Sequence, residues 1–404
     1  MSLDIRPARA EEMDQFGLMG AYSYAGAFGD GPDNVVRNSN RPEWTLCAFD
    51  GDVMATSFAA FPFTIRANGQ TLAYAGISAV GARPEYRRRG LLRKIITRAF
   101  AEQRERGQSV AGLWASQAAI YRRYGFAQMG ANRSYQVDTV DLNLLQEPTL
   151  PYMVKRYAEA QALPQMKSVY QAFAAQRFGY LHRSSAIWRN TILGPTTESG
   201  PLWSVVVSRD QQPLAYAIYT LRGDKVPHAA RSQEIVLRDL AWIDIDAYKA
   251  VWQYLAAHDL VGRISWANAP VDDPLMELLH EPRMLHTKDN EGSWFRVVDV
   301  ATALASRGYD TEGELVIEME PDDLAPWNDG RWLLQTSPSG SVVSKTAKDP
   351  HLRLSAAALS AAFTGSRSIS QLSQWGLASI EESQRLSADA IFATRYAAHC
   401  PDHY

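Results

Sequence analysis

The order strand, helix, strand between residues 71 and 115 constrains the fold of this chain more than any other feature. Residues 71–82 and 108–115 are apolar runs that predict strands. Between them, residues 90–106 place leucine, isoleucine, alanine and phenylalanine at helical spacing, and Gly107 ends the helix. A helix between two consecutive strands implies parallel pairing through a right-handed crossover. The first third of the chain is therefore expected to be an α/β domain.

Composition excludes several classes of protein. The chain has 404 residues, of which 46% are hydrophobic and 21% charged, as in folded proteins. Lys plus Arg is 41 and Asp plus Glu is 44, and this balance argues against nucleic acid as a partner. No apolar run reaches about 18 residues, and the N-terminus lacks an apolar signal core, so we expect no membrane partner and a cytoplasmic protein. Two cysteines, Cys47 and Cys400, make neither a disulfide framework nor a metal site, and no metal is expected.

Three regions follow one another along the chain, and we place them at residues 1–135, 136–298 and 299–404. The second repeats the order hairpin, strand, helix, strand of the first. The third has strands followed by helices, the last of them expected over residues 387–398, which is typical of a small α+β domain.

The segment from Ile77 to Arg93 carries the clearest chemical signal. A strand runs into Pro84, a basic turn follows, and a helix opens at Gly90. Free amides and the positive end of the helix dipole attract anions there, and arginines add charge-assisted hydrogen bonds. Glycine allows the backbone to approach a ligand closely. The segment predicts a pyrophosphate site, although three solvated arginines on a surface turn remain the alternative.

Two motifs resemble a known family. Residues 87–92, Arg-Arg-Arg-Gly-Leu-Leu, resemble the coenzyme A motif Arg/Gln-x-x-Gly-x-Gly/Ala of GCN5-related N-acetyltransferases (GNATs), with Leu92 at the second small position. Residues 114–126 resemble the segment Ala-Ser-Glu-x-x-Ile-Tyr-x-Arg-Phe-Gly-Tyr of the Eis (enhanced intracellular survival) acetyltransferases, with Gln117 replacing the more usual Glu. The resemblance implies tandem GNAT domains with mixed, mostly antiparallel central sheets and flanking helices. It also implies a C-terminal α+β domain like a sterol carrier protein, which delivers the C-terminal carboxylate.

The same resemblance implies acetyl-CoA as co-substrate and a set of residues that bind it. Backbone amides after a bulge in the strand face the acetyl and pantetheine groups, the helix N-terminus holds the phosphates, and two further residues flank the cofactor. The matching positions are Val80, Gly81 and Ala82, then Arg88, Arg89, Gly90, Leu91, Leu92 and Arg93, then Ser116 and Gln117.

For catalysis, the resemblance implies a tyrosine acid and a terminal carboxylate base. Tyr121 matches the family's general acid for the coenzyme A thiolate, and a phenol can donate a proton to a thiolate formed in a dry pocket. The alternative is a purely packed ring, with Tyr124 as the acid. The base is the terminal carboxylate of Tyr404, unless residues 401–404 are a frayed tail.

Further expectations concern cofactor number, substrate and assembly. The junction at residues 242–247 of the second region has acids and lacks the Arg-Arg-x-Gly motif, so we expect one cofactor per chain. The resemblance implies a small-molecule primary amine as acceptor (an aminoglycoside, a polyamine or a lysine side chain) and a homo-oligomer, a hexamer. The loop with Phe28, Asp30 and Asp33 offers acids that would favour a cationic amine, or it is an ordinary turn.

Two other functions remain open at this stage. The same folds could form a non-catalytic acyl-CoA or lipid-binding module. Alternatively, an enzyme of this plan could transfer a longer acyl chain, as the protein N-myristoyltransferases do with a double GNAT domain and a C-terminal base. The depth of the acyl pocket is not readable from the sequence.

Overall fold

The computed structural model describes residues 3–25, 40–149, 151–194 and 200–404. Contacts divide the chain into two compact units. Unit 1 contains residues 1–129 and 293–394 together with Tyr404, and unit 2 contains residues 130–292 and 395–403. The chain thus leaves the first unit after Met129 and returns at Ser293. The boundaries at residues 135 and 298 stay predictions.

The N-terminal part of unit 1 is built on one mixed sheet. In sheet order, its strands are β1 (Asp4–Arg6), β2 (Cys47–Asp50), β3 (Val53–Ala67), β4 (Gln70–Ala82), β5 (Val110–Leu113), β15 (Trp294–Val297) and β6 (Ala127–Gln128). β4 and β5 pair in parallel, and the other neighbouring pairs are antiparallel. The predicted crossover is confirmed, because a helix, α3 (Leu91–Glu105), connects the parallel pair.

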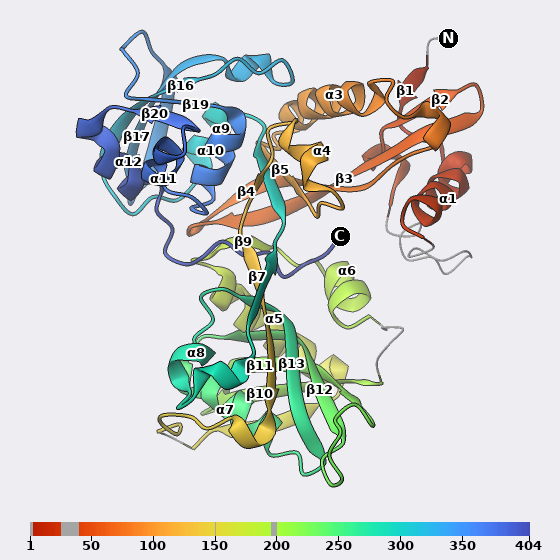
Figure 1. The fold of residues 1–404 in the computed structure, drawn as a ribbon, viewed down its shortest axis with the longest axis vertical. Helices are drawn as coiled ribbons and strands as arrows, with labels where there is room; N and C mark the ends of the chain where they lie inside the picture. The colour runs from red at the N-terminus through yellow and green to blue at the C-terminus, as the bar shows by residue number, and fades with distance from the viewer. Residues whose placement is uncertain (1–2, 26–39, 150, 195–199) are drawn as a thin grey trace. The chain divides into compact units, whose positions relative to one another are not determined.

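Helices cover both faces of this sheet (Figure 1). The apolar side of α3 packs with α4 (Ala118–Arg122) on one face, where Ile95, Phe100 and Ile77 share a core. On the other face, α1 (Met13–Ser23) packs Phe16 and Met19 against a second core that includes the fully buried Cys47. The two faces of β4 therefore meet different helices.

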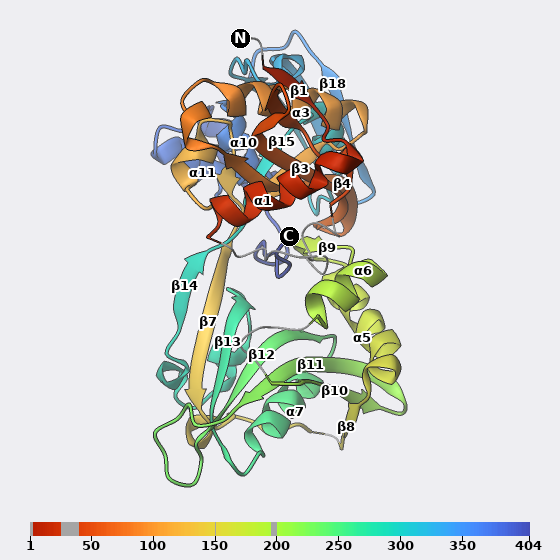
Figure 2. The ribbon, with the colours of Figure 1, turned by 90° about the vertical axis from the view of Figure 1, so that its right-hand side faces the viewer.

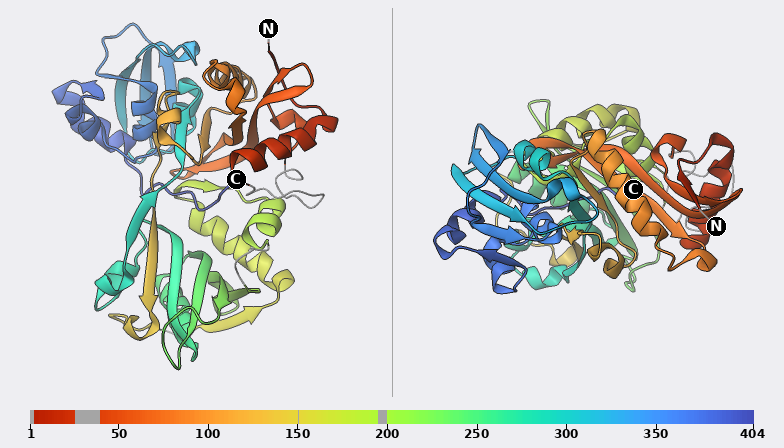
Figure 3. Two further views of the ribbon diagram at one scale, coloured as in Figure 1. Left: turned by 45° about the vertical axis from the view of Figure 1, so that its right-hand side comes forward. Right: turned by 90° about the horizontal axis from the view of Figure 1, so that it is seen from above.

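The C-terminal part of unit 1 is a smaller α+β layer. Its sheet has the order β18 (Gly340–Lys345), β17 (Gly330–Ser337), β16 (Gly313–Met319), β19 (Leu352–Leu354), β20 (Ala378–Ile380). The helices are α9 (Val300–Ser306), α10 (Ala356–Phe363), α11 (Ile369–Gln374) and α12 (Arg385–Phe392), and α10 to α12 are the blue helices beside the strands in Figure 3. Strands that precede helices confirm the expected α+β character.

Unit 2 repeats the plan of the first sheet. Its strands have the order β14 (Lys288–Glu291), β7 (Ala131–Asp138), β13 (Val261–Pro270), β12 (Gln233–Trp242), β11 (Gln212–Arg222), β10 (Leu202–Arg209), β8 (Met153–Tyr157). β12 and β13 are parallel and are connected by α7 (Ile245–Ala256), while α5 (Glu159–Ala174) covers the opposite face (Figure 2). Shorter elements of the unit are β9 (Phe178–Leu181), α6 (Ser185–Ile187) and α8 (Leu275–Leu278). The predicted tandem of similar domains and the fold class are confirmed.

The C-terminal tail differs from its prediction. A helix was expected over residues 387–398, but α12 ends at Phe392 and residues 393–404 are not helical. The amides of Ala397 and His399 donate instead to Asp272 Oδ2 (2.9 Å) and to the carbonyl of Phe178 (3.0 Å). These partners are distant in sequence, so the tail backbone is satisfied without the i to i−4 bonds of a helix.

Among the described residues, neither a membrane-spanning helix nor a group of metal-ligating side chains is present. None of their helices is both long and apolar enough to cross a membrane. No three His, Cys, Asp or Glu side chains among them come together in a way that could hold a metal ion.

Candidate active site

A β-bulge interrupts β4 directly before the predicted pantetheine-binding residues. Ser57 of β3 pairs with Gly81 and Ala59 pairs with Ser78, so Ala79 and Val80 lie opposite a single residue of β3. Ala79 adopts a φ of +51°, and the hydroxyl of Ser57 donates to its carbonyl (2.8 Å). The bulge bends β4 at Ala79 and Val80, and pairing with β3 resumes at Gly81 and Ala82. The residue type offered no signal for it, because alanine seldom adopts a positive φ.

The two parallel strands separate at the bulge. The last residue pair between β4 and β5 is Ile77 with Leu113, while β4 continues to Ala82 beside β3 alone. Among the described strands, none pairs with the β5-facing side of residues 78–82. The hydroxyl of Tyr24 reaches this stretch and donates to the carbonyl of Val80 (3.0 Å). An extended ligand with amide groups can therefore bind along this strand edge as a further strand would.

The basic turn forms an anion cradle at the start of α3. Arg88 and Gly90 have positive φ values, +63° and +74°, which turn successive backbone amides toward one side. The first helical bond joins the amide of Lys94 to the carbonyl of Gly90, so the amides of residues 91–93 have no partner within the helix. The first turn contains no acid, and residues 87–90 are exposed. These features fit a diphosphate.

The arginines of the cradle differ in their freedom. Arg87 Nε donates to the carbonyl of Ala82 (3.1 Å), and Arg89 stacks over the ring of Tyr86 (5.1 Å to the centroid). Arg93 pairs with Asp323 (3.1 Å), but both side chains are exposed and such pairs contribute little. Arg88 makes no hydrogen bond or ion pair with a described residue. Arg88 is thus the guanidinium most available to an incoming phosphate.

Tyr121 lies in α4, which follows β5 through the exposed residues Ser116 and Gln117. Its ring is 4% exposed and packs edge-on against Phe126 (5.9 Å between centroids). Its hydroxyl makes no hydrogen bond with a described residue. Burial raises the pKa of Tyr121 well above its usual range, and the nearby phenols of Tyr24 and Tyr124 raise the pKa further. Tyr121 is therefore protonated at neutral pH, which is the state that a proton donor requires.

Tyr404 packs against β3 and β4. Its ring meets Phe63 edge-on (5.1 Å between centroids), and its hydroxyl shares a hydrogen bond with Tyr74 (2.5 Å). A side chain on Gly76 would clash with this arrangement, since a Cβ there would lie 2.6 Å from Phe63 and 2.9 Å from Tyr404. Gly112, the β5 partner of Gly76, leaves room for Tyr74 in the same way. These glycines were not singled out from the sequence, although glycine within a strand signals a close approach.

Tyr121 and Tyr404 approach the parallel pair from opposite faces. Tyr121 shares its core with Ala75 and Ile77 of β4. Side chains alternate along a strand, so Gly76, and with it the ring of Tyr404, faces the other side. On that side a row of half-buried rings continues from Phe63 to Phe61 and Trp44, at 5.5 and 5.8 Å between centroids.

The second parallel pair lacks such a cradle. Asp244 caps α7, where its carboxylate accepts a hydrogen bond from the amide of Ala247 (2.8 Å), and Asp246 lies in the first turn. Two carboxylates at this helix start would repel a phosphate. The acidic loop with Phe28, Asp30 and Asp33 lies outside the described residues.

Comparisons with known proteins agree along the whole chain. Residues 4–129 and 179–297 each match an acetyltransferase (GNAT) domain, and residues 300–401 match a sterol carrier protein domain. An uncharacterised N-acetyltransferase of Streptomyces avermitilis is 30% identical over 337 residues, 82% of each chain. The N-acetyltransferase Eis of Mycobacterium tuberculosis is 26% identical over 79% of this chain and 78% of its own. The crystal structure of Eis1 from Mycobacterium abscessus is 25% identical, with a TM-score of 0.85 over 99% of this chain and 100% of that one. The divergent strands, the basic helix start and these similarities together lead to one conclusion: the chain belongs to the Eis family of GNAT N-acetyltransferases.

Proposed function

We propose that this acetyltransferase moves the acetyl group of acetyl-CoA directly onto a primary amine, with Tyr121 as general acid and the terminal carboxylate of Tyr404 as general base. One observation carries the proposal. A buried phenol and the ring of the C-terminal residue meet the parallel strands β4 and β5 from opposite faces. A donor and an acceptor of protons on opposite sides suit a reaction in which one proton leaves the nucleophile and another reaches the leaving group.

Two features would bind different parts of acetyl-CoA: the cradle would bind the diphosphate, and the free edge of β4 would bind the pantetheine arm. Amides of Gly90, Leu91, Leu92 and Arg93 and the guanidinium groups of Arg88 and Arg89 would hold the diphosphate. The main chain of residues 80–82 would hold the pantetheine arm, and Ser116 and Gln117 would flank it after β5. The acetyl thioester supplies the activated carbonyl carbon, and the protein orients it beside the bulge.

Tyr121 serves the leaving group. As the new C–N bond forms and the C–S bond breaks, negative charge develops on sulfur, and the phenol donates its proton there. The acylated nitrogen still carries two protons and releases one to solvent, and the phenolate regains a proton from solvent, which leaves the amide and free coenzyme A. The raised pKa of Tyr121 keeps that proton in place until the thiolate appears. The nearby phenol of Tyr24 already donates its one proton to the carbonyl of Val80, which leaves Tyr121 as the donor to the sulfur.

The terminal carboxylate serves the nucleophile. It would accept a proton from the ammonium group of the substrate, directly or through water, and so free the nitrogen lone pair for attack. Packing of the Tyr404 ring against Phe63 and its bond to Tyr74 restrict the end of the chain. Because the base is already ordered before the reaction, less conformational entropy is lost on reaching the transition state.

The substrate class of the proposal is a small cationic amine: an aminoglycoside, a polyamine or a lysine side chain. The aromatic row of Phe63, Phe61 and Trp44 supports it, because ring faces attract ammonium groups. The proposal includes a cytoplasmic homo-oligomer, a hexamer, which sedimentation would test. It also keeps the division into domains 1–135, 136–298 and 299–404, with the third delivering the carboxylate.

A thiol-release screen tests the function directly. Purified protein is mixed with acetyl-, propionyl- or palmitoyl-CoA and a panel of primary amines, and free coenzyme A is measured. We expect turnover with acetyl-CoA and at least one cationic amine, and little with palmitoyl-CoA. Binding of acetyl-CoA without thiol release for any amine would contradict the proposal in favour of a binding module. Preference for palmitoyl-CoA would contradict the acetyl assignment.

Extending the chain tests the base. One glycine added after Tyr404 moves the carboxylate by about 3.5 Å. We expect kcat to fall by about 100-fold or more, because small misplacements of a reacting group are costly. As matched control, Tyr404→Phe keeps the carboxylate and the ring and removes only the bond to Tyr74, so its kcat should fall by about tenfold at most, far less than in the extended protein. Native kcat in the extended protein would place the base elsewhere.

A further inference from the structure

Unit 2 repeats the strand divergence of the active site. Arg238 is an extra residue in β12, because Ile218 pairs with Asp239 and Tyr219 pairs with Leu237. The last residue pair between β12 and β13 is Leu237 with Trp266, directly beside this bulge. In unit 1 the last pair, Ile77 with Leu113, lies two residues before the bulge at Ala79. The second GNAT domain thus retains the strand geometry of a cofactor site without its phosphate cradle.

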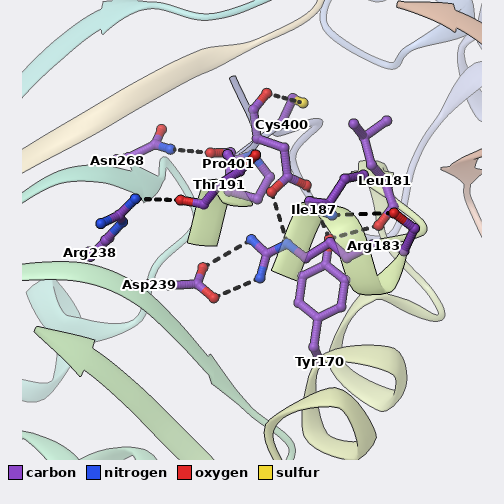
Figure 4. Close-up of polar contacts among 12 residues, drawn as sticks. Tyr170, Leu181, Arg183, Ile187, Thr191, Arg238, Asp239, Asn268, Cys400 and Pro401 are labelled. Atoms are coloured by element: carbon purple, nitrogen blue, oxygen red, sulfur yellow. Dashed lines mark hydrogen bonds and ion pairs between the residues drawn. The ribbon is translucent and has the colours of Figure 1, made fainter. Parts of the chain in front are cut away.

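The C-terminal tail lies at this second divergence. The side chain of Asn268, two residues beyond the last β13 pair, donates to the carbonyl of Pro401 (2.8 Å; Figure 4). A cavity of about 10 Å³ is lined there by Asp239 and Leu240 of β12, Trp266 and Asn268 of β13, and His399 and Pro401 of the tail. Both strands and the tail therefore enclose the same small space.

A buried ion cluster holds the tail more firmly. The guanidinium of Arg183 is fully buried and binds Asp239 through two hydrogen bonds, at 2.6 and 3.0 Å. Its Nε donates to Asp402 Oδ1 (2.8 Å), and Asp402 is only 2% exposed (Figure 4). The hydroxyl of Tyr216 donates to Asp239 (2.6 Å), and that of Tyr170 lies 3.4 Å from Asp402. Asp239 follows the bulge directly, so the cluster joins β12 to the tail.

Both ion pairs of this cluster share Arg183. Arg183 faces two carboxylates, and the buried guanidinium has no other ionic partner among the described residues. Buried charges are retained in proteins where they are paired and hydrogen-bonded in one geometry. Removing the carboxylate of Asp402 would leave Arg183 with Asp239 and would free the tail without stripping the cluster of all its partners.

We infer that the second GNAT domain uses its cofactor-like strand divergence to seat the chain's own C-terminus, through a tail seat made of Arg183, Asp239, Asn268 and Tyr170. Resting on the proposed role of the terminal carboxylate, the inference makes Asp402 and Arg183 positioning residues for that group. Only His403 separates Asp402 from Tyr404, so the tail seat restricts where the carboxylate can lie. The domain that lacks the cofactor motif thereby contributes to catalysis in the other domain.

Asp402→Asn tests the tail seat with two readouts. The first is the rate at which a carboxypeptidase releases Tyr404, and the second is kcat with acetyl-CoA and an accepted amine. We expect at least tenfold faster release, at least tenfold lower kcat and a KM for acetyl-CoA within twofold of native. Asp289→Asn is the matched control, because Asp289 pairs with Arg133 in unit 2 and touches no tail residue described here. It should change neither readout.

The combined results separate this inference from the proposed function. Faster release with lower kcat supports both. Faster release with native kcat supports the tail seat and contradicts the terminal carboxylate as base. If Asp402→Asn releases Tyr404 at the native rate, the tail seat is overturned at any value of kcat. The glycine extension then tests the terminal carboxylate as base by itself. If Asp402→Asn does not fold, Asn268→Ala, which removes only the bond to Pro401, takes its place with a threefold or larger effect expected on release.

Discussion

At the scale of single residues, Tyr121 shows how burial can prepare a side chain for one chemical role. The phenol is enclosed by apolar neighbours and other phenols, and no described residue satisfies its hydroxyl. Both circumstances disfavour the phenolate, because a charged oxygen would have neither water nor a donor beside it. The phenol is therefore protonated at neutral pH and unsuited to abstracting a proton from an amine, which agrees with the proposed role as proton donor.

Tyr121→Phe isolates the hydroxyl from the ring. The ring keeps its contact with Phe126, so the fold and the binding of acetyl-CoA should be preserved within about twofold. We expect kcat to fall by about 100-fold to 10,000-fold, the usual contribution of a general acid. Tyr124→Phe serves as control, because it removes the neighbouring phenol and should leave most of the rate. Steady-state kinetics on the two variants decides which phenol is the acid, and unchanged kcat in Tyr121→Phe would exclude it.

At the scale of elements, α3 and α7 occupy equivalent places in the two sheets but have opposite helix starts. α3 begins with an arginine turn, a glycine at positive φ and no acid in its first turn. α7 begins with its own carboxylate cap and a second acid, whose pKa is lowered to about 2 by hydrogen bonds from Thr149 and Lys249. The first turn of α3 has no acidic side chain, whereas in α7 the carboxylate of Asp244 already accepts the hydrogen bond of the Ala247 amide.

Arg88→Gln measures what the cradle contributes to cofactor binding. A charge-assisted hydrogen bond to phosphate is lost, and we expect KM for acetyl-CoA to rise about tenfold or more with kcat within twofold. Arg106→Gln, at the far end of the same helix, removes an equal charge away from the cradle and should leave KM unchanged. If both substitutions raise KM for acetyl-CoA equally, the net charge of the helix and not the position of Arg88 determines cofactor binding.

At the scale of the whole molecule, each chain should bind one acetyl-CoA, and the site should lie in the first GNAT domain. The carboxylates at the start of α7 and the tail residues at its strand divergence leave the second domain without an anion site of the first kind. Isothermal titration with acetyl-CoA should therefore give a stoichiometry of about one per chain, and Arg88→Gln should weaken that single site. A second site of similar affinity would contradict this division of roles.

Unit 2 should also carry a distinctive pH dependence of stability. Asp273 is buried beneath Tyr135 and Tyr248, and burial raises its pKa to about 6 from an ordinary 3.8. Between these two pKa values the folded state holds a proton that the unfolded state releases. The contribution of Asp273 to stability is therefore fully present below about pH 4 and is lost as pH rises through 6, by about 3 kcal/mol at most.

Asp273→Asn should remove this decline, as chemical unfolding of the chain at pH 4.5 and pH 7 would show. Asp289→Asn is the control, because Arg133 lowers the pKa of Asp289 and its contribution has the opposite sign. If the difference in unfolding free energy between the two pH values is the same in Asp273→Asn and in the native protein, Asp273 does not titrate in this range.

The amino-acid sequence by itself determined the local elements and the chemistry of the first helix start. Apolar spacing predicted α3, the parallel pair β4 and β5, and the repeated order in the second region, because these patterns arise within a few neighbouring residues. The arginine turn predicted an anion site for the same reason. Only the tertiary structure decided that β15 joins the first sheet and that residues 393–404 are not helical.

The tail shows why the rest was beyond local patterns. Tyr74 and Tyr404 are 330 residues apart, and Asp402 and Arg183 are 219 apart, yet each pair shares a hydrogen bond. A backbone segment becomes helical or extended according to which partners satisfy its amides and carbonyls. For this tail the hydrogen-bond partners come from β9, β13 and distant side chains. The residues near the tail in the sequence give no signal that predicts these partners.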